Sequence, residues 1–138
     1  MLYYLASPYA AYHLGKEAAA KEAARIAALL LDRGMVVYSP ITHSHQLAHH
    51  MDNHTDHEFW LRADIPFMEA SRELIIAPME GWRASRGIRF EVEWFDRFKR
   101  IDPYLLNLAR LSFERLPAKE IRWEGGALTH PIDVDKIN

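Results

Sequence analysis

The N-terminal part of the chain alternates between short apolar runs and one long alanine-rich segment, and this alternation constrains the fold more than any other feature. Leu2 to Ala6 is an apolar, aromatic run that a Ser-Pro pair ends, so it predicts a strand buried on both faces. From about His13 to Arg33 the sequence predicts an alanine-rich helix that packs closely on a sheet, with Gly34 after its end. Met35 to Ser39 predicts a second strand, stopped by Pro40. A strand–helix–strand unit with such short joints is parallel and right-handed.

The remainder of the chain continues this alternation. We predict a helix from roughly Asp56 to Ala70, a strand from Leu74 to Ala77, a helix that opens near Ser85, a strand within Arg100 to Leu106 that Pro103 places at an edge, and a last helix from Leu105 to Leu116. The polar tail from Pro117 predicts no defined structure. The pattern indicates an α/β domain over residues 1–116, with a Rossmann-like (flavodoxin-like) three-layer fold, a parallel sheet of four or five strands, and a C-terminal extension over residues 117–138.

Length and composition exclude several classes of protein. The chain has 138 residues, which fits one domain with one core. It has no cysteine, which excludes disulfides and thiolate catalysis, and its net charge of -2 gives no general attraction to nucleic acid or to a membrane. It shows no apolar run long enough to cross a bilayer and no basic leader, so we expect a cytoplasmic protein without membrane or nucleic-acid partners.

One carboxylate lies in the wrong place for a packed helix. On the helix after the third strand, Ile88, Val92, Phe95 and Phe98 form one apolar face, and Glu91 projects into the middle of it. A carboxylate directed at a core costs several kcal/mol unless it is paired, protonated or placed in a cavity. Glu91 is therefore the leading catalytic candidate, and the alternative is a core residue held in a salt bridge.

Polar, proline or aromatic residues follow three predicted strands, and the carboxyl ends of parallel strands share one edge of a sheet. At the start of the Glu91 helix, a serine can cap the helix and bind an anion, and a glycine allows a ligand close to the first turn. The alternative is an ordinary cap and a packing glycine. We expect one cleft to gather these substrate-binding residues: Ser7, Tyr9, His43, His45, Ser85, Arg86 and Gly87.

A second carboxylate, Asp64, lies on the apolar side of its own predicted helix. Cleavage of an N-glycosidic bond needs an acid at the leaving base and a nucleophile or stabiliser at the sugar carbon, so two carboxyl groups in one cleft suit that chemistry. The alternative is a residue near the helix end that pairs with Arg62 or Arg72.

Six of the eight histidines lie between His43 and His57. Two pairs have i,i+4 spacing, His45 with His49 and His50 with His54, which would allow a metal site. The spacing matches no standard metal motif, so we expect no metal and assign most of these histidines to a solvated helix face. The Gly-x-Gly-x-x-Gly fingerprint and the P-loop are also absent, and no cofactor is expected.

Five segments carry a family resemblance through their order and spacing. They are Tyr4-Leu-Ala-Ser-Pro-Tyr9, Val37-Tyr-Ser-Pro-Ile-x-His43-Ser-His45, Trp60-x-x-x-Asp64, Glu73-Leu-Ile-Ile and Gly81-Trp-Arg-x-Ser-x-Gly-Ile-Arg-x-Glu91. Together they resemble the nucleoside 2-deoxyribosyltransferase-like superfamily, and within it the small bacterial and phage proteins of the DUF1937 type. The resemblance covers roughly residues 2 to 100.

The resemblance implies roles for individual residues. Glu91 would be the nucleophile that attacks the anomeric carbon of a nucleoside or nucleotide and forms a glycosyl-enzyme ester, with net retention. Asp64 would handle the base as proton donor or anchor, and Tyr3 would hydrogen-bond the nucleophile. Superfamily members are commonly dimers or larger, so a homo-oligomer is expected, and Trp94 and Phe98, which we expect to be exposed, would suit its interface.

One position departs from the deoxyribosyltransferases themselves, which carry an aspartate six residues before the nucleophile. Ser85 stands at that position, as it does in the nucleotide N-hydrolase branch, where the serine touches a 5′-phosphate. With Arg86 and Arg89 nearby, this favours a nucleoside 5′-monophosphate and hydrolysis, and it leaves transfer open. The alternative hypotheses are a nucleotide-binding module without turnover and a His-dependent metal hydrolase.

Overall fold

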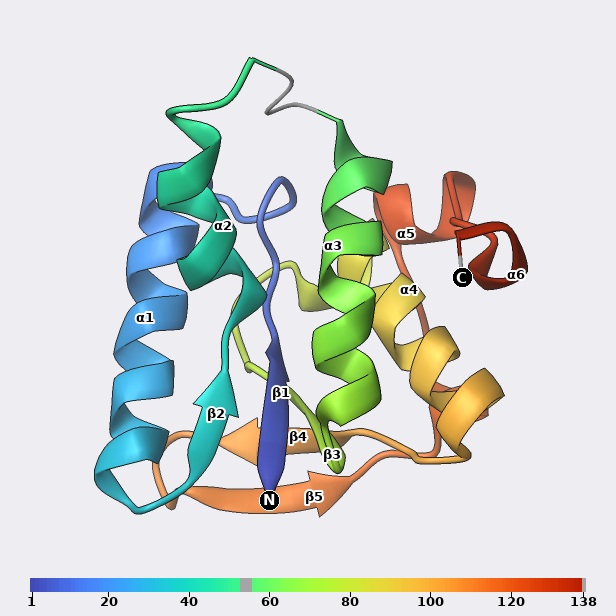
Figure 1. The fold of residues 1–138 in the computed structure, drawn as a ribbon. Coiled ribbons are helices and arrows are strands. Elements are labelled where there is room, and N and C mark those ends of the chain that lie inside the picture. The colour runs from blue at the N-terminus through green and yellow to red at the C-terminus, as the bar shows by residue number, and fades with distance from the viewer. Residues whose placement is uncertain (53–55, 138) are drawn as a thin grey trace.

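The computed structural model describes residues 1–52 and 56–137, and within them five strands form one sheet in the order β2-β1-β3-β4-β5 (Figure 1). The strands are β1 Leu2–Ala6, β2 Val36–Tyr38, β3 Glu73–Ile76, β4 Tyr104–Asn107 and β5 Ser112–Arg115. The first four are parallel, and β5 pairs antiparallel with β4. This is the flavodoxin-like strand order with an antiparallel edge, so the predicted Rossmann-like fold is confirmed.

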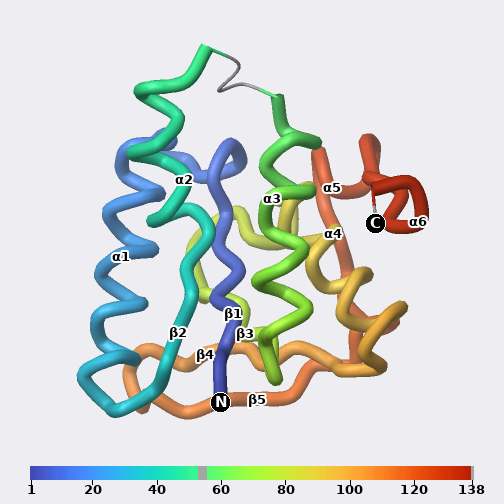
Figure 2. Tube along the Cα trace, viewed as in Figure 1, coloured from blue at the N-terminus to red at the C-terminus, as the bar shows by residue number. Residues whose placement is uncertain are grey.

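Helices cover both faces of the sheet. They are α1 Lys16–Asp32, α2 Pro40–Ala48, α3 His57–Ala70, α4 Arg86–Trp94 with a π-helical continuation Phe95–Lys99, α5 Gly125–Thr129 and α6 Val134–Ile137, besides two 3₁₀ turns, Trp82–Ala84 and Ala118–Glu120. Helix α1 packs on one face of the sheet, whereas α3 and α4 pack on the other, as the chain trace shows (Figure 2). None of the helices in the described residues is long and apolar enough to cross a membrane.

The long helix α1 follows its sequence pattern closely. Its buried stripe consists of small and branched residues at helical spacing: Ala19, Ala23, Ile26 and Leu30. Gly34 adopts φ +85° after the helix and donates its N–H to Leu31 O, as predicted for that position. The helix begins later than predicted, because Gly15 has φ +93° and a turn from Tyr12 to Gly15 precedes it.

The starts of the next helices are set by side-chain caps. Ser39, Asp56 and Ser85 each accept a hydrogen bond from the backbone N–H three residues further on, at 3.4, 3.3 and 3.2 Å. The cap at Asp56 confirms the predicted start of α3, and the cap at Ser85 confirms the predicted start of α4. Pro66 lies inside α3 without ending it.

The predicted helix from Leu105 to Leu116 is wrong, because these residues form β4, a turn and β5. Leu105 and Leu106 lie on β4, whereas Leu108 and Leu111 lie in the turn before β5. Asn107 Oδ1 accepts the Arg110 N–H at 3.1 Å to close this turn. The predicted edge position is wrong too, since β4 pairs on both sides. Pro103 precedes the strand, so no ladder hydrogen bond is lost.

The C-terminal segment is ordered and packs on α4. Ala127, Ile132 and Ile137 are buried, and Arg89 Nη1 donates to Ala127 O at 2.7 Å. Two expectations for the α4 face need correction: Trp94 is buried in the core, and Phe98 is 40% exposed rather than part of the packed face. The exposed pair that was to suit an oligomer interface is therefore reduced to Phe98.

Candidate active site

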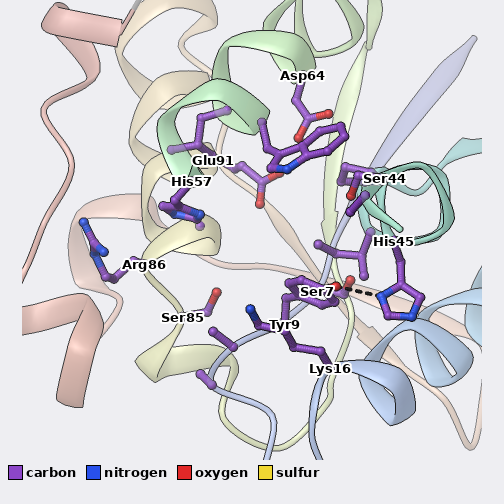
Figure 3. A pocket seen from close by; sticks show the side chains of 18 of the residues that line it. Ser7, Tyr9, Lys16, Ser44, His45, His57, Asp64, Ser85, Arg86 and Glu91 are labelled. Atoms are coloured by element: carbon purple, nitrogen blue, oxygen red, sulfur yellow. Dashed lines mark hydrogen bonds between the residues drawn. The ribbon is translucent and has the colours of Figure 1, made fainter. Parts of the chain in front are cut away.

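A cavity of about 1120 Å³ opens at the carboxyl edge of the sheet, where the chain after β1 meets α2, α3 and the start of α4 (Figure 3). Strands β1 and β3 are neighbours, and the chain after β1 continues into α1 on one face of the sheet whereas the chain after β3 continues into α4 on the other. In open α/β sheets such a point is where ligands bind. The cavity is large enough for a ligand the size of a nucleotide.

Eight of the ten predicted site residues line this cavity: Ser7, Tyr9, His45, Asp64, Ser85, Arg86, Gly87 and Glu91. The other two lie elsewhere. His43 is exposed on α2 and packs against the rings of Tyr38 and Phe67, with centroids 5.8 and 6.0 Å away. Tyr3 belongs to the cluster that packs under α1, on the opposite face of the sheet from Glu91.

Tyr4, not Tyr3, is the tyrosine beside the predicted nucleophile. Successive side chains of a strand point to opposite faces, so Tyr4 lies on the face that α3 and α4 cover. Its hydroxyl is fully buried close to the carboxyl groups of Glu91 and Asp64, yet it completes no regular hydrogen bond within the described part of the chain. Strand alternation predicts that Tyr3 and Tyr4 lie on opposite faces of the sheet, and the packing of α3 and α4 decides which of them meets Glu91.

Glu91 and Asp64 form a buried pair of carboxyl groups, with exposures of 5% and 8%. Burial raises the pKa of Glu91 well above its ordinary value, the Tyr4 hydroxyl opposes this, and the charge of Asp64 adds to it. Burial also raises the pKa of Asp64 to about 7, against the hydrogen bond that Tyr38 Oη donates to Asp64 Oδ1 at 3.3 Å and the nearby Tyr4 hydroxyl. Near neutral pH the pair therefore retains a proton that solvated carboxyls would have lost.

A hydrogen-bonded chain reaches the same cavity from α1 and α2. Tyr9 Oη lies 2.6 Å from His45 Nδ1, and His45 Nε2 lies 2.7 Å from Glu17 Oε2. His45 is buried, whereas Glu17 is exposed. Sequence reasoning found Tyr9 and His45 but missed Glu17, because no local pattern connects the start of α1 with α2.

Among the described residues, the same region contains a group of side chains able to hold a metal ion. Ligand atoms of Glu17, His45 and His49 lie within 4.8 Å of one another. His54 of the second predicted histidine pair lies outside the described residues, so that pair is not placed.

Positive groups line the cavity on both sides, Lys16 with its ammonium 5.3 Å from the Tyr9 ring centroid and Arg86 at the start of α4. Arg86 Nε donates to His130 O at 2.6 Å, which ties this side chain to the C-terminal segment. The Ser7 hydroxyl is buried at the cavity wall without a hydrogen-bond partner among the described residues. A buried hydroxyl without a protein partner at a cavity wall can form a hydrogen bond with a polar group of a ligand.

Fold and cavity together define a class: a Rossmann-like α/β domain with a pair of buried carboxyl groups at the carboxyl edge of its sheet. Residues 2–101 match the domain of unknown function DUF1937, and the chain belongs to this family. No curated protein matches the chain.

Proposed function

We propose that the protein cleaves or transfers the N-glycosidic bond of a nucleoside or nucleoside 5′-monophosphate through a covalent glycosyl–Glu91 intermediate. The observation that carries this proposal is the pair of buried carboxyl groups, Glu91 from α4 and Asp64 from α3, in one cavity of sufficient size. A retaining displacement at an anomeric carbon needs one ionised and one protonated carboxyl. A coupled pair that shares a single proton meets this need when the proton lies on Asp64 and Glu91 is ionised, although burial raises the pKa of both groups. The sequence resemblance to deoxyribosyltransferase-like proteins supports the same chemistry.

In the first step, a Glu91 carboxylate oxygen attacks C1′ and the bond from C1′ to the base nitrogen breaks. The departing base takes the electron pair of that bond and receives the proton of Asp64. In the second step, water attacks C1′ and gives a proton to Asp64, and the ester oxygen leaves as the Glu91 carboxylate. A second base in place of water gives transfer, and both outcomes retain configuration.

The charges around the cavity support a ligand with a 5′-phosphate. Ser85 lies at the N-terminus of α4, where helix amides favour anions, and Lys16 and Arg86 add positive charge. In Figure 3 the side chains of Ser85 and Lys16 lie at the opposite end of the view from Asp64, which would leave the sugar between phosphate and base sites.

The test is a panel of ribo- and deoxyribonucleosides and their monophosphates, incubated with the full chain, with free base measured. We expect release that Glu91→Gln lowers at least a thousand-fold, whereas Glu93→Gln, a half-buried glutamate on the same helix, changes it little. Mass spectrometry of an acid-quenched reaction is expected to show a glycosyl adduct on the peptide that contains Glu91. Base release that survives Glu91→Gln would refute the proposal.

A second candidate is a metal-dependent hydrolase, favoured by the grouping of Glu17, His45 and His49. Two histidines and a glutamate are a donor set that binds zinc and leaves a position open for water. Activity that a chelator abolishes and zinc restores would favour this candidate, and activity indifferent to chelator would favour the carboxyl pair. Ligand binding without any base release would instead indicate a binding module.

A further inference from the structure

The carboxylate of Glu17 sets the direction of the two hydrogen bonds that link Tyr9, His45 and Glu17. An ionised carboxylate only accepts, so the 2.7 Å contact with Glu17 requires that His45 Nε2 carry a proton. In a neutral imidazole the other nitrogen then has a lone pair, and the Tyr9 hydroxyl donates to Nδ1 across 2.6 Å. Burial of His45, and its edge-on contacts with the rings of Tyr9 and His49 at 5.7 and 5.0 Å, hold the imidazole in this orientation.

This direction decides what Tyr9 offers to the cavity that it lines. Its single proton is committed to His45, so the lone pairs that remain on Oη can only accept. The negative charge of Glu17 polarises the imidazole and strengthens the bond from Tyr9.

We infer that Tyr9 is a specificity-determining residue whose oxygen accepts a hydrogen bond from a hydroxyl or amino group of the ligand, and that His45 and Glu17 are positioning residues that set this polarity. A ligand that lacks the donor leaves the Tyr9 lone pair unpaired in a desolvated site, and sites of this kind reject such analogues strongly. The inference rests on the proposed function only for the nature of the ligand.

A bound metal ion would reverse the direction of the hydrogen bond between Tyr9 and His45. A metal held by Glu17, His45 and His49 would take the His45 Nε2 lone pair, which moves the ring proton to Nδ1. Tyr9 would then accept from His45 and turn its own proton toward the cavity. The tautomer of His45 therefore separates the two arrangements without any knowledge of the substrate.

The first arm of the test measures that tautomer in the full-length protein. Long-range ¹H–¹⁵N spectra of histidine-labelled protein are recorded at about pH 9, where an ordinary imidazole is neutral, with chelator and again with one equivalent of zinc. The His45 signals are assigned by their loss in His45→Gln. We expect a proton on Nε2, no change in His49→Ala, and a new population with the proton on Nδ1 in Glu17→Gln. A proton on Nδ1 in the wild type, or zinc displacing the Nε2 proton at one equivalent, would overturn the inference.

The second arm measures the consequence for binding in the non-cleaving Glu91→Gln background. Dissociation constants are compared for adenosine 5′-monophosphate, its 2′-deoxy and 3′-deoxy forms, and purine riboside monophosphate, which lacks the amino group. We expect that removal of one of these ligand groups weakens binding about ten-fold or more when Tyr9 is present, and less than about two-fold when Tyr9→Phe is added. The group whose removal has this effect shows whether Tyr9 contacts a sugar hydroxyl or the amino group of the base. Losses that persist unchanged in Tyr9→Phe would overturn the inference. If no compound binds, the nucleotide proposal fails, and the tautomer alone decides the polarity of Tyr9.

Discussion

The hydroxyl of Tyr38 donates a hydrogen bond to Asp64 Oδ1 across 3.3 Å, while the Tyr38 ring stacks on Phe67 with centroids 4.0 Å apart. Tyr38, at the end of β2, thus contacts α3 in two ways: its hydroxyl binds the Asp64 carboxyl group, and the face of its ring packs on Phe67. Ring and hydroxyl can be separated by mutation, so the electrostatic contribution of Tyr38 can be measured apart from its packing.

In Tyr38→Phe we expect the pKa of Asp64 to rise above its value of about 7, because a hydrogen bond that favours the ionised carboxyl is lost. The measurement is a titration of the Asp64 carboxyl carbon by NMR. Phe67→Leu is the control, since it removes the stacked ring and leaves the hydroxyl. An Asp64 titration that is the same in Tyr38→Phe and wild type would contradict the assignment.

Replacement of Asp64 by asparagine should stabilise the protein at high pH. Burial raises the pKa of Asp64 from 3.8 to about 7, so its contribution to stability is complete below about pH 4 and is lost as the pH rises through 7. That difference corresponds to at most about 4 kcal/mol. We expect chemical denaturation to show little difference between Asp64→Asn and wild type at pH 4, and a gain of about 1–4 kcal/mol for the mutant at pH 9. Asp32→Asn, at an exposed position, should show no such rise with pH.

Tyr4→Phe and Tyr3→Phe form a matched pair on one strand. Loss of the Tyr4 hydroxyl should raise the pKa of Glu91 further and reduce base release, because that hydroxyl favours the ionised Glu91. The free energy of unfolding should stay within about 1 kcal/mol or increase, since the buried hydroxyl completes no regular hydrogen bond with the residues that the structure describes. Tyr3→Phe should leave base release unchanged. A larger loss of activity in Tyr3→Phe than in Tyr4→Phe would restore the role that the resemblance gave to Tyr3.

Two glycines near the site should respond in opposite ways to alanine. Gly81 has φ +88°, and an added Cβ would lie 2.6 Å from Ala11 O, so we expect Gly81→Ala to cost about 1–3 kcal/mol or more. At Gly87, in the first turn of α4, a Cβ would meet His57 Cε1 at 3.7 Å, an ordinary contact. Gly87→Ala should therefore keep or slightly raise stability and weaken ligand binding, because the methyl group enters the cavity. Thermal unfolding and binding of nucleoside monophosphates check both; equal stability of the two mutants would contradict the backbone argument.

Local signals predicted strands β1, β2 and β3 and helices α1, α3 and α4 correctly. The apolar run of β1 and the alanine stripe of α1 are short-range patterns, and Ser85 shows how one cap residue defines a helix start. The burial of Glu91 was predictable for the same reason, since its position at helical spacing among apolar residues places the carboxylate on the buried face of the helix. The β4–β5 hairpin was not predictable in this way, because leucines at positions 105, 106, 108 and 111 fit a helical period. The strand conformation depends instead on the pairing of β4 with β3 and β5.

The sequence by itself determined the class of fold, the buried carboxyl on α4, and the ends of β1 and β2 as parts of the cavity wall. Which partners meet there depended on the tertiary structure. Tyr4 rather than Tyr3 reaches Glu91 because one face of β1 is covered by α3 and α4, and Glu17 reaches His45 because α1 and α2 pack together after separate loops. Such contacts join residues far apart in the chain, and their geometry is set by packing of whole elements rather than by any local pattern.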